Sequence, residues 1–196
     1  MMDSFFSLVM GLAILGVVLY AVFRPKEKSE GHGGKDAYFY IVMFLALMPL
    51  FWGVADLGRL GLEGVWDIRS SYTYGQRSAE DQARRISLRM SAIVVALPVY
   101  VFHWYKAGSR KKEEMDWGSK RSYMVAVLIL SLILVLTVGI WLVYQGFNAL
   151  LGAVSRDVKQ QVAYALPYAV VSAAVWGWHM KGWQELKKQE GVKPTS

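Results

Sequence analysis

The stretch SYMVAVLILSLILVLTVGIWLVYQGFNALLGAVS, residues 122–155, contains no charged side chain. A helix needs about 20 predominantly apolar residues to cross the hydrocarbon core of a bilayer. Backbone groups in that core must be hydrogen-bonded within the protein, so a continuous apolar run of this length predicts a transmembrane helix. The sequence does not decide between one tilted helix over the whole run and a shorter helix followed by an interfacial turn at residues 146–152.

Similar runs occur elsewhere in the chain, and the overall composition agrees with them. Hydrophobic residues make up 55% of the sequence and charged residues 19%, against about 45–50% and 25% in soluble domains. Prolines lie inside three of the runs, which membrane helices tolerate. We therefore predict five transmembrane helices, near residues 4–23, 37–57, 86–105, 122–147 and 160–180.

The predicted fold is all-α: a four-helix bundle, arranged as two tandem helical hairpins or without a true repeat, plus a separate N-terminal anchor helix. The closing helices of the two hairpins align at an offset that superposes His103 on His179. Apolar residues of the loop after residue 57 could line one side of a surface helix. The predicted parts are an anchor (1–23), a flexible linker (24–36), a first hairpin (37–109) with an extramembrane loop (58–85), a cytoplasmic loop (110–121), a second hairpin (122–183) and a cytoplasmic tail (184–196).

Lysines and arginines gather on one side of this topology. The linker, the loop at 110–121 and the tail hold more of them than the opposite loops do. Cytoplasmic loops carry such an excess in membrane proteins. We expect the N-terminus outside and the C-terminus in the cytoplasm. These basic loops account for the net charge of +7, so the charge does not indicate that the protein binds nucleic acid. The expected partners are the lipid bilayer and other membrane protein subunits.

Two apolar runs end in an aromatic residue, a histidine and a cation. The first reads VYVFHWYKAGSRKK, residues 99–112, and the second VWGWHMKGWQELKK, residues 175–188. His103 and His179 fall at the same expected depth, as the two axial ligands of a b-type haem would. Lys106, Arg110 and Lys181 could contact the haem propionates. The alternative is that both histidines anchor their helices at the membrane surface, and neither is expected to bind a metal other than haem iron.

Other chemistry has little support in the sequence. There is no cysteine, which excludes thiol catalysis and thiolate metal sites. Asp56 and Arg59 are spaced to pair on one helix face, and we interpret them as a local ion pair at the surface. No predicted span has a charged residue at its centre, which argues against a transporter because transporter sites lie near the midplane. No catalytic motif is present, so catalysis by this chain alone is not expected.

The stretch RRISLRMSAIVVALPVYVFHWYKAG, residues 84–108, is preceded by DAYFYIVMFLALMPLFWG, residues 36–53. Together they resemble an uncharacterised family of bacterial multi-pass membrane proteins, catalogued as a domain of unknown function. The resemblance rests on a helix end of the form Pro-x4-His-Trp, formed by Pro98, His103 and Trp104. It covers residues 35–109 well and the second hairpin weakly, where Ala174 aligns with Pro98. It implies a membrane fold in the bacterial inner membrane and no particular activity.

The expected function is therefore that of a structural or accessory subunit of a larger membrane complex, respiratory or photosynthetic, without catalysis of its own. The alternative is a membrane cytochrome that carries electrons through one haem b held by His103 and His179.

Overall fold

A computed structural model describes residues 33–66, 68, 79–109, 117–152 and 158–190. These residues form long α-helices and no strand. The helices are α2 (Gly33–Val65), α3 (Ala79–Gly108), α4 (Trp117–Leu150) and α5 (Val158–Glu190). The predicted anchor at residues 1–23 lies outside the described residues. The all-helical fold class is thus confirmed for the described part of the chain.

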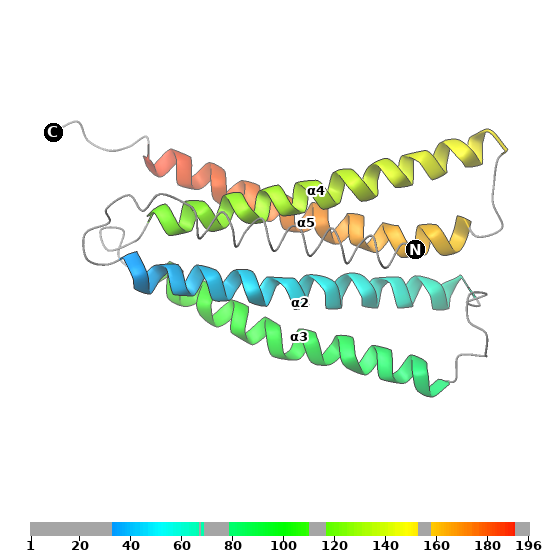
Figure 1. Ribbon diagram of the computed structural model, residues 1–196, viewed down its shortest axis with the longest axis horizontal. Coiled ribbons are helices and arrows are strands. Elements are labelled where there is room, and N and C mark those ends of the chain that lie inside the picture. Colours follow the sequence, from blue (N-terminus) through cyan, green and yellow to red (C-terminus); the bar gives the residue numbers. More distant parts are fainter. Residues whose placement is uncertain (1–32, 67, 69–78, 110–116, 153–157, 191–196) are drawn as a thin grey trace.

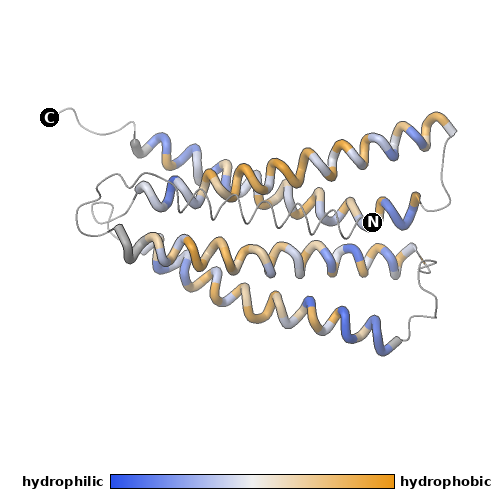
Figure 2. The backbone as a smooth tube through the Cα atoms, viewed as in Figure 1, coloured by the Kyte–Doolittle hydropathy of each residue, from blue (hydrophilic) through white to orange (hydrophobic). Residues whose placement is uncertain are grey.

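The four helices run side by side as two hairpins, α2 with α3 and α4 with α5 (Figure 1). Helix α2 packs on all three of the others, whereas α3 packs extensively on α2 alone. At 30–34 residues each, the helices are about 45–50 Å long, which exceeds the roughly 30 Å hydrocarbon core of a bilayer. Hydrophilic residues are concentrated toward the helix ends (Figure 2).

Three of these helices are long and apolar enough to cross a membrane, over Ala37–Val65, Glu80–Gly108 and Trp117–Leu150. They match three of the five predicted spans. Helix α5 is of similar length, but its described residues contain no stretch apolar enough to count as a candidate span. The structure therefore supports membrane association through α2, α3 and α4.

Several helix boundaries differ from the sequence prediction. The apolar residues after residue 57 continue α2 to Val65 rather than forming a separate surface helix, so that prediction was wrong. Leu60, expected on that surface helix, is buried at 7% exposure. Helix α4 continues unbroken to Leu150, and the chain turns at Gly152, whose φ is 74°. Residues 122–150 are therefore one helix.

The core consists of two apolar clusters stacked along the bundle. One is rich in aromatic residues and methionine and lies at the end where α2 and α4 begin; it contains Tyr40, Met43, Phe44, Leu47, Ala107, Tyr123, Met124, Val127 and Leu130. The second lies nearer the opposite end and contains Phe51, Ala55, Leu134, Val138, Ala165 and Tyr168. Polar side chains adjoin both clusters, and these are the candidate functional groups.

Candidate functional site

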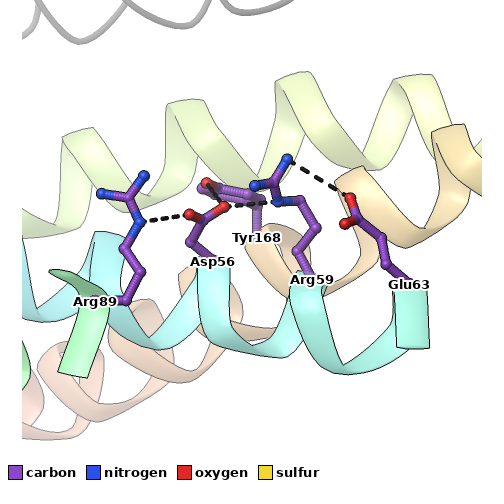
Figure 3. Close-up of polar contacts among 5 residues, drawn as sticks. All are labelled: Asp56, Arg59, Glu63, Arg89 and Tyr168. Carbon is purple, nitrogen blue, oxygen red and sulfur yellow. Dashed lines mark hydrogen bonds and ion pairs between the residues drawn. The ribbon is translucent and has the colours of Figure 1, made fainter. Parts of the chain in front are cut away.

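Asp56, on α2, is a buried carboxylate at the centre of a group of charged residues, of which Arg59 is also buried and Arg89 and Glu63 are partly exposed (Figure 3). Its Oδ1 is 2.6 Å from Arg59 Nε, one turn further along α2, and Arg89 Nε of α3 donates to its Oδ2 at 2.5 Å. Tyr168 Oη of α5 donates to Oδ1 at 3.5 Å. One carboxylate thus joins side chains from three helices.

Arg59 is almost as buried as Asp56, at 6% against 3% exposure. Its guanidinium carbon lies 4.2 Å from the centre of the Tyr164 ring, and its Nη1 is 3.7 Å from Glu63. The contact of its Nε with Asp56 is ionic and lacks hydrogen-bond alignment, so Nε is buried without a hydrogen-bond partner. The aromatic face and the second carboxylate compensate part of the cost of burying this cation.

Two arginines and two acids give this cluster no net formal charge, which is the condition for burying ions at tolerable cost. Both carboxylate oxygens of Asp56 contact an arginine, so the cluster can hold the helices together. A charged cluster of this kind is a weak source of stability relative to apolar packing, but removing one member leaves the others buried and uncompensated.

The sequence prediction of this site was half correct. The pairing of Asp56 with Arg59 is confirmed. Its placement at the surface was wrong, because side chains from α3 and α5 cover it. Arg89 and Tyr168 were missed. Arg89 begins the apolar part of the third predicted span, and an arginine inside a span requires a partner. Asp56, near the end of the preceding predicted span, was one candidate, so this signal was present.

A second polar chain crosses the other end of the bundle through His179. The imidazole Nδ1 is 2.8 Å from the carbonyl oxygen of Val175, and Nε2 is 3.0 Å from Tyr123 Oη. The Tyr123 hydroxyl is in turn 3.3 Å from that of Tyr100 on α3. A carbonyl oxygen only accepts, so in a neutral imidazole Nδ1 carries the proton and Nε2 accepts. Tyr123 then donates to His179, and Tyr100 donates to Tyr123.

The direction of this chain predicts unequal effects of two similar substitutions. Tyr123→Phe leaves His179 Nε2 buried without a donor, so we expect the free energy of unfolding to fall by about 1–3 kcal/mol. Tyr100→Phe removes only the first donor of the chain, and its cost should be under about 1 kcal/mol. Unfolding in mixed micelles, followed by circular dichroism, measures both. Equal losses would contradict the assigned direction.

His103 has a different environment from His179. Its Nδ1 is 2.7 Å from the carbonyl oxygen of Val99, and its ring packs against Tyr38 and Phe39 of α2. The structure thus places His103 against α2 and His179 against α4. The two helix ends do approach each other through Trp104 and Trp178, whose ring centres are 6.1 Å apart.

Two of the three cations predicted to contact haem propionates, Lys106 and Lys181, lie in the part of the chain that the structure describes. Lys106 Nζ lies 5.8 Å from the centre of the Phe102 ring. Lys181 is exposed, and Arg110 lies outside the described residues. Haem ligation by His103 and His179 stays a prediction, and the side-chain arrangement does not fit it, since iron would have to displace the Tyr123 hydroxyl from His179 Nε2.

A spectrum of the protein tests the haem prediction directly. We expect no reduced α-band in protein purified in mild detergent from haem-supplied cells and treated with dithionite, because His179 is engaged at both nitrogens. A sharp α-band that disappears in both His103→Ala and His179→Ala would instead establish the ligand pair.

Among the residues that the structure describes, no group of three or more His, Asp or Glu side chains is placed to hold a metal ion. A family model described as a domain of unknown function, DUF5671, matches residues 36–174. The chain belongs to the DUF5671 family. The predicted membership of an uncharacterised family is thus confirmed, and the match extends through most of the second hairpin, where the resemblance was weak. No curated protein and no solved structure matches the chain.

Proposed function

We propose that this DUF5671 protein is a non-catalytic subunit of a larger membrane assembly, and that α3 is the helix through which it binds its neighbour. The observation that supports this is the uneven packing of α3. It packs extensively on α2 alone, and only 11% of its most apolar stretch is buried, against 39% for α2.

The shape of the α3 surface also favours a protein neighbour. An apolar groove of about 510 Å³ runs between α2 and α3, lined by residues that include Leu45, Pro49, Ser91, Val95 and Val99. Small side chains and serine hydroxyls are typical of surfaces where membrane helices pack together. A single neighbouring helix of the assembly would fill this groove.

Photocrosslinking tests this proposal. A benzoylphenylalanine at Val95 of α3, which lines the groove and is 67% exposed, would react with a neighbour on that face; the matched control is Ile140 of α4, 68% exposed. We expect a protein adduct from Val95, and from Ile140 lipid adducts without protein. Lipid adducts alone at both positions, together with migration of the extracted protein as a solitary monomer, would overturn the proposal.

The full topology of this subunit is proposed as five spans, with the N-terminus outside and the C-terminus in the cytoplasm of the bacterial inner membrane. The absence of native cysteine makes a labelling test clean. We expect a membrane-impermeant maleimide to label Gly64→Cys in intact cells but to leave Ser109→Cys unlabelled until the cells are broken. The reverse pattern would invert the orientation.

A further inference from the structure

A cavity of about 160 Å³ opens between the two hairpins, at the end of the bundle where α2 and α4 begin and α3 ends. Tyr40, Met43, Met124 and Leu186 form its apolar side. The volume corresponds to about five water molecules, so it accommodates a small polar group rather than a folded peptide. The cavity lies outside the Asp56 cluster.

The cavity exists because residues at its edge are small. Ala107 and Gly108 end α3 here, and Gly182 faces them from α5. A Cβ on Gly182 would approach Met124 Cε to 3.0 Å, whereas nothing lies within 4 Å of the position of a Cβ on Gly108. A larger side chain at 108, which lines the cavity, is therefore accommodated without a steric clash at its Cβ.

Two side chains of opposite charge line this cavity, Lys120 of α4 and Glu185 of α5, beside the ring of Trp104. A ligand with a single negative charge would be attracted by one and repelled by the other, and the same holds for a cation. Lys120 Nζ also lies 5.4 Å from the centre of the Trp117 ring. A zwitterion that places its anion near Lys120 and its ammonium near Glu185 adds an opposite charge to each. Trp104 offers an aromatic face on which the ammonium can also rest.

The surroundings of the cavity place this zwitterion at the depth of lipid headgroups. Arg121 and Lys187 both lie over the Trp183 ring, with their charged groups 5.7 and 5.4 Å from its centre. Tryptophan and cations occupy the headgroup region of membrane proteins. An apolar wall next to a charged mouth fits a molecule with an acyl chain on one side and a charged headgroup on the other.

We propose that this cavity binds the headgroup of an amine-bearing phospholipid, with the phosphate at Lys120 and the primary ammonium at Glu185. Phosphatidylglycerol lacks the ammonium and would meet the Glu185 carboxylate. Phosphatidylcholine carries three methyl groups in place of the N–H donors that a carboxylate binds. The site therefore selects phosphatidylethanolamine over both, and it needs no partner protein.

Native mass spectrometry of the delipidated full-length protein measures this selectivity. The probes are phosphatidylethanolamine, phosphatidylglycerol and phosphatidylcholine with identical acyl chains, each titrated into the same detergent. We expect phosphatidylethanolamine to bind about tenfold more tightly than phosphatidylglycerol, as one charge-assisted hydrogen bond implies. Equal or tighter binding of phosphatidylglycerol would overturn the proposal.

Three variants locate the binding. Glu185→Gln should abolish the preference for phosphatidylethanolamine over phosphatidylglycerol, Lys120→Gln should weaken both lipids, and Gly108→Leu should exclude both by filling the cavity. The matched controls are Lys188→Gln on the exposed side of α5 and Gly61→Leu on α2, where a Cβ also meets nothing within 4 Å. Retention of wild-type selectivity in Glu185→Gln, or of wild-type binding in Gly108→Leu, would refute the site.

Competition with soluble phosphoethanolamine distinguishes a phospholipid ligand from a soluble molecule that carries the same headgroup. If the lipid is the ligand, millimolar phosphoethanolamine leaves phosphatidylethanolamine bound, because the acyl chains supply most of the affinity. If phosphoethanolamine displaces the lipid at equal concentration, the cavity is a site for a soluble phosphoamine, and the proposed lipid is wrong.

Discussion

Asp56→Ala is expected to destabilise the bundle by about 3–5 kcal/mol, the typical cost of breaking a buried ion pair by removing one partner. The substitution leaves Arg59 buried at 6% exposure and removes the acceptor of Arg89 on the neighbouring helix. The free energy of unfolding in mixed micelles measures the loss. Limited proteolysis should show earlier cleavage between α2 and α3, because the link between them is gone.

The control for Asp56→Ala separates charge from packing. Glu63→Ala removes a carboxylate that lies 3.7 Å from Arg59, further away than Asp56, and that is more accessible to solvent. The loss in the free energy of unfolding should therefore be under about 1 kcal/mol. The triple variant Asp56→Leu, Arg59→Met, Arg89→Met replaces the Asp56 carboxylate and the two arginines that contact it by apolar side chains, leaving only the more accessible Glu63, and should recover most of the stability lost in Asp56→Ala. A triple variant as unstable as Asp56→Ala would mean that the ion pairs themselves stabilise the fold, rather than only neutralising one another's charge.

The helices were predictable because each depends on a property of a continuous run of residues. Absence of charge over residues 122–155 is a local signal, and α4 follows it. The apolar run predicted the third helix from residue 86, and α3 begins earlier, at Ala79, with Glu80 and Asp81 in its first turn. The extension of α2 to Val65 was not predicted, because glycines at 58, 61 and 64 favour a turn by local propensity. Packing of Leu60 in the core overrides that propensity.

The site was predictable only where it is local. Asp56 and Arg59 are three residues apart on one helix, so spacing alone pairs them. Arg89 and Tyr168 reach the same carboxylate from α3 and α5, and their contact depends on how the helices rotate and tilt against each other. For the same reason, equal depth of His103 and His179 does not predict which neighbour each side chain faces; the structure places them against α2 and α4 respectively.

Gly53 lies where α2 and α3 are in close contact, and its substitution should have the second large effect. A Cβ at this position would lie 2.8 Å from Ile93 Cγ1 and 3.2 Å from the carbonyl oxygen of Arg89. The carbonyl belongs to the backbone of α3, so Gly53→Ala must push α3 away from α2. We expect a loss of about 1–3 kcal/mol in the free energy of unfolding, measured in mixed micelles.

The same glycine tests whether the ion cluster depends on helix separation. Gly61→Ala, on the same helix with nothing within 4 Å of its Cβ, should be neutral or stabilising by about 0.5–1 kcal/mol. Adding Ile93→Ala to Gly53→Ala relieves the side-chain overlap but not that with the Arg89 carbonyl, so recovery should be partial. Because Arg89 also binds Asp56, Gly53→Ala and Arg89→Met should be less than additive. Strict additivity would mean that the two helices separate without disturbing the cluster.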